Sequence, residues 1–224
     1  MTTSAQSVAR ELALWLLSQQ RQPRHLSPSQ ASSDERLLEL VLQEAIDLRE
    51  GGDAQLSLQL LQSLEQTGLQ SPWLLDNQAR ALVDLGYRQQ ALDLWERLLE
   101  HSDAAVAATA RDMAEQQSAS LRNALGSVCA REGWVPRHLG AGEPTGLIDQ
   151  VLQEVITARE AQQPQLSLDL VLTTLEQGWQ HPWLLDNQAR ALVHLEREAE
   201  ALQIWEQLAC HDDADLAHTA QDMV

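Results

Sequence analysis

The chain contains 224 residues, of which 44% are hydrophobic, and its 33 acidic and 15 basic residues give a formal net charge of −18. A chain of this length buries enough apolar surface to fold without disulfides or a metal, and its two cysteines, Cys129 and Cys210, do not suggest a disulfide framework. The negative charge argues against general binding to nucleic acids or to anionic membranes.

The N-terminal segment predicts one amphipathic helix. Thr3 or Ser4 is expected to cap this helix, which extends to about Gln20 with apolar residues along one side. Its apolar run, from Leu12 to Leu17, is too short for the core of a signal peptide or for a membrane span. We therefore expect a cytoplasmic protein.

The segment that follows predicts a loop and then a series of helices. Residues 23–33 contain prolines and several serines, which are typical of a loop. Apolar spacing beyond the loop predicts helices after Ser33, Asp53, Ser71 and Ser102, with one more around Trp95. Residues 104–125 lack Gly and Pro, so the last helix is expected to continue into the second half of the chain. No segment alternates with a period of two, and no sheet is expected.

An internal repeat is the strongest signal in the sequence. Residues 72–83 recur unchanged at 182–193, an offset of 110 residues (182 − 72). Further identities keep this offset along most of the chain, and the tetrapeptide Pro-Arg-His-Leu at 23–26 recurs at 136–139. We therefore expect two tandem units, residues 1–116 and residues 117–224, joined by a continuous helix.

A shorter period lies inside each copy and indicates helix pairs. Gly52 and Gly86 are 34 residues apart (86 − 52), as are Leu61 and Trp95 (95 − 61). The segment 72–103 resembles a tetratricopeptide repeat (TPR), in which matching places are held by Ala79, Leu82, Gly86, Ala91, Trp95 and Leu98. Residues 182–213 form a good second match, and residues 38–71 and 148–181 form poorer ones.

The resemblance implies a fold and a binding surface. The fold is an all-α, right-handed, TPR-like solenoid of antiparallel helix pairs that stack on their neighbours, with Trp95 and Trp205 in the core. The first helix of each pair then lines a concave groove. The residues expected in the groove are Trp73, Asp76, Asn77, Arg80, Asp84, Trp183, Asp186, Asn187 and Arg190.

These groove residues have both a binding and a structural interpretation. Asn77 and Asn187 match the asparagine with which the family typically holds a peptide backbone, and Arg80 and Arg190 are suited to receiving a carboxylate. Alternatively, Asp76 and Arg80 form an ordinary pair four residues apart, Asn77 braces a helix, and the two tryptophans pack between repeats. Both interpretations stay open at the level of sequence.

Two further motifs have a functional and a structural interpretation. The Pro-Arg-His-Leu loops are suited to binding an anion at a helix start, or else Leu26 and Leu139 anchor the loop while Arg and His are solvated. The run from Cys210 to Asp213 contains potential metal ligands, but it also fits a solvated helix cap. No motif of a known catalytic site occurs, so we predict no enzyme activity, no cofactor and no metal.

The predicted function is a non-catalytic scaffold or adaptor that binds another protein or a peptide. The acidic surface favours a basic partner, because opposite charges speed association. One alternative is a structural helical-repeat protein that assembles into a homo-oligomer without a peptide groove. A regulatory part of an enzyme is a further alternative.

Overall fold

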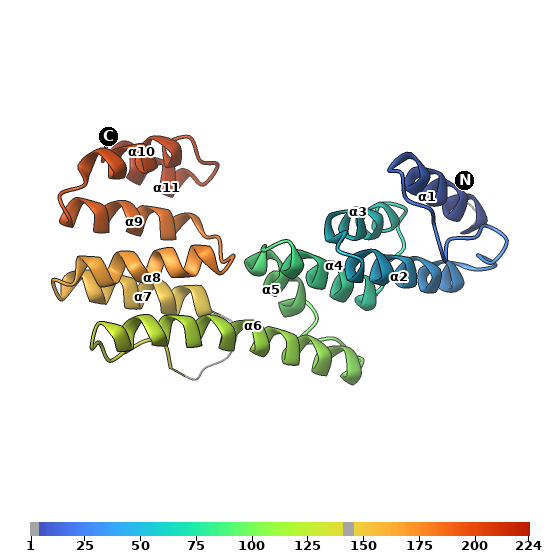
Figure 1. Cartoon of the computed structure of the whole chain (residues 1–224), viewed down its shortest axis with the longest axis horizontal. Helices are drawn as coiled ribbons and strands as arrows, with labels where there is room; N and C mark the ends of the chain where they lie inside the picture. The colour runs from blue at the N-terminus through green and yellow to red at the C-terminus, as the bar shows by residue number, and fades with distance from the viewer. Residues whose placement is uncertain (1–4, 141–145) are drawn as a thin grey trace. The chain divides into compact units, whose positions relative to one another are not determined.

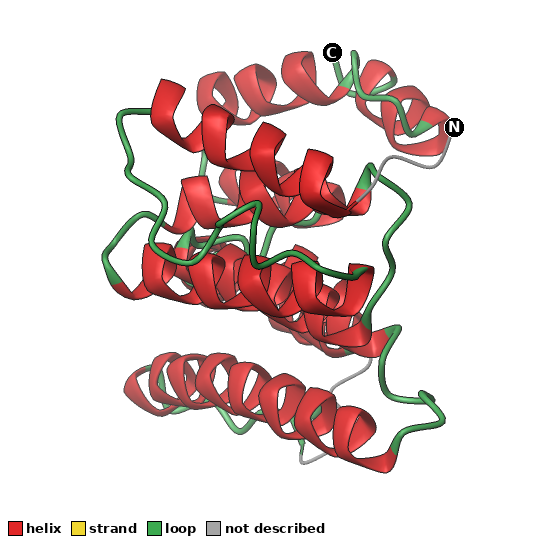
Figure 2. Cartoon of the chain, turned by 90° about the vertical axis from the view of Figure 1, so that its right-hand side faces the viewer, coloured by secondary structure: helices red, strands yellow, loops and turns green. Residues whose placement is uncertain are grey.

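The computed structural model describes residues 5–140 and 146–224. Within these ranges all regular structure is helical, with eleven helices and no strand, which confirms the expected all-α class (Figures 1 and 2). None of the described helices is both long and apolar enough to cross a membrane. The chain divides into two compact units, Met1–Arg111 (unit 1) and Asp112–Val224 (unit 2).

Unit 1 is a series of helices in which each one packs on the next. Helix α2 packs on α3, α3 on α4 and α4 on α5, while α2 also touches α4 and α1 touches both α2 and α3 (Figure 1). The helices are α1 (Ala5–Ser18), α2 (Asp34–Glu50), α3 (Ala54–Glu65), α4 (Pro72–Asp84) and α5 (Arg88–Glu96). Helix α6 (Ala104–Arg131) follows. It begins in unit 1, continues into unit 2 and contains the stretch without Gly or Pro.

Only some of the N-cap residues predicted from the sequence form capping hydrogen bonds in unit 1. Ser33 caps α2, because its side chain accepts a hydrogen bond from the backbone N–H of Arg36. Asp53 occupies the cap position of α3 but makes no capping bond, and its carboxylate pairs with Arg21 instead. The cap expected at Thr3 or Ser4 lies outside the described residues.

Unit 2 repeats this pairwise packing. Helices α7, α8, α9, α10 and α11 each pack on the next, and α9 also touches α7 and α11 (Figure 1). These helices are α7 (Leu147–Glu160), α8 (Pro164–Glu176), α9 (Pro182–His194), α10 (Glu198–Leu208) and α11 (Ala214–Gln221). Their apolar sides meet in a core that includes Trp205, Leu208 and Leu216.

Small residues allow close helix contacts at the same place in both units. Ser57 is buried and its hydroxyl donates to the carbonyl of Ala45 at 2.7 Å, across the contact between α3 and α2. Ser167 makes the matching bond to the carbonyl of Val155 at 2.9 Å. Each bond satisfies a polar group that would otherwise be buried without a partner.

The turns between paired helices use a left-handed backbone in both units. Gly86, between α4 and α5, has a φ of 83°, which glycine adopts at little cost. Glu196, its counterpart in unit 2, has a φ of 60° and therefore holds the same turn with a less favoured residue. The chain geometry at this turn is thus kept even where the glycine of the sequence pattern is absent.

The two tryptophans predicted to be core residues are buried. Trp95 on α5 is 0% exposed and Trp205 on α10 is 4% exposed. Each one packs beside the helix that carries the repeated twelve-residue segment, α4 or α9.

Candidate functional site

The repeated segment folds into matching helices, α4 and α9, whose apolar residues face inward. Pro72 and Pro182 occupy the first helical turn, where a missing N–H has no cost. Leu74, Ala79 and Leu82 of α4 are buried, as are their counterparts in α9. Any binding surface on α4 or α9 must therefore be formed mainly by the polar residues of the segment.

Two of the predicted groove residues, Asp76 and Asp186, lie inside the units. Asp76 is 5% exposed and Asp186 is 2% exposed. One oxygen of Asp76 accepts from the indole N–H of Trp95 at 2.9 Å, and the other accepts from Nε of Arg80 at 2.8 Å. Asp186 accepts in the same way from Trp205 at 3.0 Å and from Arg190 at 2.7 Å. Both carboxylates are thus used to fix a tryptophan and an arginine, and they offer a partner almost no surface.

The asparagines of the segment are also used locally. The side-chain N–H group of Asn77 donates to the carbonyl of Trp73 at 2.8 Å, and that of Asn187 donates to the carbonyl of Trp183 at 2.9 Å. Asn187 is buried, whereas Asn77 is partly exposed. These bonds bring the asparagine beside the tryptophan that precedes it by one helical turn.

The accessible side chains of this surface are aromatic and cationic. Trp73 is 39% exposed, while Trp183 is partly buried against the core of unit 2. The side chains of Arg80 and Arg190 are 30% and 33% exposed, because only their Nε edge is taken by the buried aspartates. A binding role for the nine predicted residues stays a prediction. Asp84, whose side chain is 43% exposed, also lies at this surface, and Asn77 and Trp183 are partly exposed.

A residue that the sequence analysis did not single out completes the surface in each unit. Arg49, on α2, forms an ion pair with Asp84 at 3.2 Å. Arg159, on α7, is its counterpart (159 − 49 = 110) and donates to the side-chain oxygen of Asn187 at 2.9 Å. The 110-residue offset was the signal that could have identified these arginines, because both copies carry one there.

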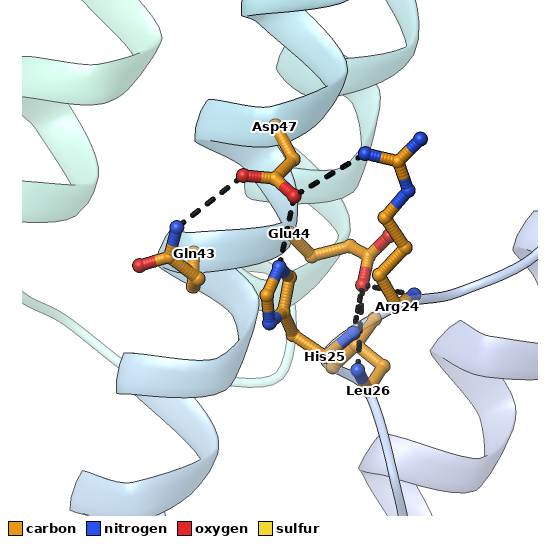
Figure 3. A network of polar contacts seen from close by, with 6 residues as sticks. All are labelled: Arg24, His25, Leu26, Gln43, Glu44 and Asp47. Carbon is orange, nitrogen blue, oxygen red and sulfur yellow. Dashed lines mark hydrogen bonds and ion pairs between the residues drawn. The ribbon is translucent and has the colours of Figure 1, made fainter.

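The second motif, the Pro-Arg-His-Leu loop, binds an anion that belongs to the chain itself. The buried carboxylate of Glu44 on α2 accepts from the backbone N–H groups of Arg24 at 2.8 Å, His25 at 2.6 Å and Leu26 at 3.4 Å (Figure 3). Leu26 is buried and anchors the loop, as the structural interpretation expected, but Leu139 is only partly buried and His25 contacts Asp47 instead of being solvated. The internal carboxylate occupies the N–H groups that an external anion would need.

The corresponding loop of unit 2 is built around Glu154, which is 0% exposed. Its carboxylate accepts from the backbone N–H groups of Arg137 at 2.8 Å and His138 at 2.7 Å. A third donor, the indole N–H of Trp134, approaches at 2.6 Å. Trp134 is therefore part of the same carboxylate-centred loop.

The histidine of the first loop contacts a carboxylate that has no equivalent in the second. His25 Nε2 lies 2.9 Å from Asp47, which also accepts from Gln43 at 3.3 Å (Figure 3). The hydrogen bond from His25 is the main cause that holds the pKa of Asp47 below its ordinary value, in opposition to desolvation. His138 instead faces Thr157 at 3.1 Å.

Replacing His25 by alanine is expected to raise the pKa of Asp47 toward its ordinary value. The lowered pKa means that the bond stabilises the folded chain above the unfolded-state pKa, about 4, and that this contribution is lost as the pH falls through the lower, folded-state value. An NMR titration of the Asp47 carboxyl carbon measures the change. His138→Ala is the matched control, and an equal Asp47 pKa in all three proteins would contradict the assignment.

The segment with potential metal ligands near the C-terminus forms a helix cap. The carboxylate of Asp213 accepts from the backbone N–H groups of Asp215 and Leu216, and so caps α11. The ring Nδ1 of His211 accepts from the backbone N–H of Asp213 at 3.0 Å. Within the described part of the chain, no group of three or more His, Cys, Asp or Glu residues is arranged to hold a metal ion.

Comparison of the chain with protein-family models, with curated proteins and with solved structures finds no match.

Proposed function

We propose that the protein is a scaffold that binds another protein or a peptide through the polar surface of α4 and α9, in the manner of a TPR-like repeat. The observation that carries this proposal is a tryptophan and an arginine that recur on α4 and α9. Trp73 is 39% exposed and Trp183 is partly exposed, while the side chains of Arg80 and Arg190 are 30% and 33% exposed and are each held at Nε by a buried aspartate. The buried aspartates hold Arg80 and Arg190 in place before any partner arrives. Residues fixed in advance lose less conformational freedom on binding.

The chemistry of the surface supports recognition. Tryptophan and arginine are enriched at the energetic centres of protein interfaces, because each combines a large contact area with directional donors. Two copies of such a surface on one chain also permit bivalent binding, in which the second contact benefits from a high effective concentration. The acidic chain, with its formal charge of −18, favours a partner whose overall charge is positive.

Removing the accessible side chains is expected to abolish capture of the partner. The test variant carries Trp73→Ala, Arg80→Gln, Trp183→Ala and Arg190→Gln, and it is immobilised beside the wild-type chain to capture proteins from the native lysate. The control variant carries Leu14→Ala and Leu17→Ala, which remove exposed apolar residues of α1. Circular dichroism verifies that all three proteins stay helical.

Capture by the wild type and by the control, with loss in the folded test variant, is the expected result. Equal capture by all three proteins would contradict the assigned surface. Self-association is the competing function, and it is favoured by the exposure of Leu14 at 59% and Leu17 at 52%. A concentration-dependent oligomer that is lost in the α1 variant, without capture of any other protein, would replace the scaffold proposal.

A further inference from the structure

Five polar positions around α4 and α9 can be compared between the two units at the 110-residue offset. Four pairs are identical at the 110-residue offset, namely Arg49 and Arg159, Asp76 and Asp186, Asn77 and Asn187, and Arg80 and Arg190. The fifth pair differs, because Asp84 at the end of α4 is replaced by His194 at the end of α9. This exchange removes one carboxylate from unit 2.

The missing carboxylate is the one that neutralises an arginine in unit 1. There, Nη1 of Arg49 lies 3.2 Å from an oxygen of Asp84, while Arg80 is paired with Asp76. Each of the two guanidinium groups thus has its own carboxylate. The arrangement shows that the geometry beside Arg49 accommodates a carboxylate.

In unit 2 the corresponding arginine has only a neutral partner. Nη1 of Arg159 donates to the amide oxygen of Asn187 at 2.9 Å, and among the described residues Arg159 forms no ion pair. The carboxylate of Asp186 is already shared by Arg190 and Trp205. Desolvation and then the nearby Arg190 lower the pKa of Arg159, against the opposite effects of Asp186 and Glu160. The positive charge of Arg159 is therefore not neutralised by a directly paired carboxylate.

This region of unit 2 is accessible from solvent. The Arg190 side chain is 33% exposed, Arg159 is partly exposed and His194 is exposed. A guanidinium group with free N–H donors binds carboxylates and phosphates through paired, charge-assisted hydrogen bonds. Asp186 and Glu160 lie close enough to affect Arg159, and they oppose a doubly charged phosphate more strongly than a singly charged carboxylate.

We propose that Arg159 and Arg190 of unit 2 form a binding site for a carboxylate of the partner, and that the matching position of unit 1 is closed by the chain's own Asp84. The proposal rests on the binding function proposed above, because the partner supplies the carboxylate. It makes the two copies unequal, since unit 2 is open to an anionic group and unit 1 is already filled.

The test uses two reciprocal substitutions in the full chain. His194→Asp supplies to unit 2 the carboxylate that unit 1 has, and Asp84→His removes it from unit 1. The probe is acetate, titrated at constant ionic strength with chloride as the balancing anion, because exposed ion pairs are screened by salt. Arginine side-chain N–H signals are followed by NMR, and Arg159→Gln and Arg49→Gln assign them.

We expect acetate to produce a saturable shift of the Arg159 signal in the wild-type chain. In His194→Asp the apparent affinity is expected to fall by about tenfold or more, because the internal carboxylate competes for the same donors. In Asp84→His a new saturable response is expected at Arg49. Absence of a response at Arg159 in the wild type, or an equal response in His194→Asp, would overturn the proposal, and so would tighter binding of inorganic phosphate than of acetate.

A second titration distinguishes the two sources of a carboxylate in a protein. The probes are the N-acetylated peptide Lys-Lys-Ala-Ala with a free carboxyl terminus, the same peptide amidated, and amidated Lys-Lys-Glu-Ala. Tighter binding of the first or the third than of the second supports the site and identifies a terminal or a side-chain carboxylate. Equal binding of all three would overturn it.

The outcome for this site is separable from the outcome for the scaffold function. If acetate fails to bind while the wild-type chain still captures a partner, the carboxylate site is rejected and the scaffold function stands. If acetate binds at Arg159 while no partner is captured, the anion site exists and the scaffold function is rejected.

Discussion

Replacing Trp95 by alanine is expected to lower the free energy of unfolding of unit 1 by about 3–5 kcal/mol. The indole is 0% exposed, so its removal leaves a cavity between α4 and α5. It also removes the donor at 2.9 Å from the buried Asp76, whose carboxylate then retains only Arg80 among these partners. Urea unfolding followed by circular dichroism measures the change.

The variant Trp95→Phe separates the two contributions. Phenylalanine fills much of the space but cannot donate to Asp76, so we expect a smaller loss of about 1–3 kcal/mol. Trp73→Ala is the control, because Trp73 is 39% exposed and its removal is expected to change stability by about 1 kcal/mol or less. A Trp95→Ala chain that unfolds at the wild-type urea concentration would show that the indole is not a core residue in solution.

The sequence predicted the helices well because their start and stop residues have local causes. Ser33 accepts the N–H of Arg36 within the same helix, and Gly86 supplies a left-handed turn, so neither depends on distant contacts. The resemblance to a short helical repeat likewise predicted that Trp95 and Trp205 are buried, as they are. These features are encoded over a few residues, which is the range that a periodicity argument covers.

The candidate site was harder to predict because its side chains form hydrogen bonds both within their own helix and with residues that are distant in the sequence. Asp76 has an arginine one turn away, which the sequence shows, but also a tryptophan 19 residues away (95 − 76) on another helix. Spacing along α4 cannot show whether that carboxylate faces a groove or α5. Asp53 is a second example, because it occupies the N-cap position of α3 but forms an ion pair with Arg21 instead of a capping hydrogen bond.

The same limit explains why the buried glutamates were not foreseen. A glutamate in the middle of an amphipathic helix normally faces solvent, and burial of its charge requires compensating donors. Those donors come from loops 18 to 20 residues before Glu44 and 16 to 20 residues before Glu154. The loop motif and the glutamate were both repeated in the sequence, but their pairing appears only once the loop has folded back onto the helix.

Replacing Glu154 by alanine is therefore expected to destabilise unit 2 by about 3 kcal/mol, because its three donors then lose a charged acceptor. Arg137 and His138 are exposed enough for water to replace part of the loss, whereas the indole N–H of Trp134 is partly buried. Urea unfolding of Glu154→Ala, with Glu44→Ala as the matched variant of unit 1, measures the effect.

A double-mutant cycle with Trp134→Phe and Glu154→Ala isolates the shortest of these bonds, the one at 2.6 Å. We expect a coupling energy of about 1–2 kcal/mol between the two positions, since phenylalanine keeps the ring while removing the donor. The sum of the single effects would equal the double effect if the indole contributed only by packing. In that case the carboxylate would be held by the two backbone N–H groups alone, and the tryptophan that is unique to the second loop would serve to cover it.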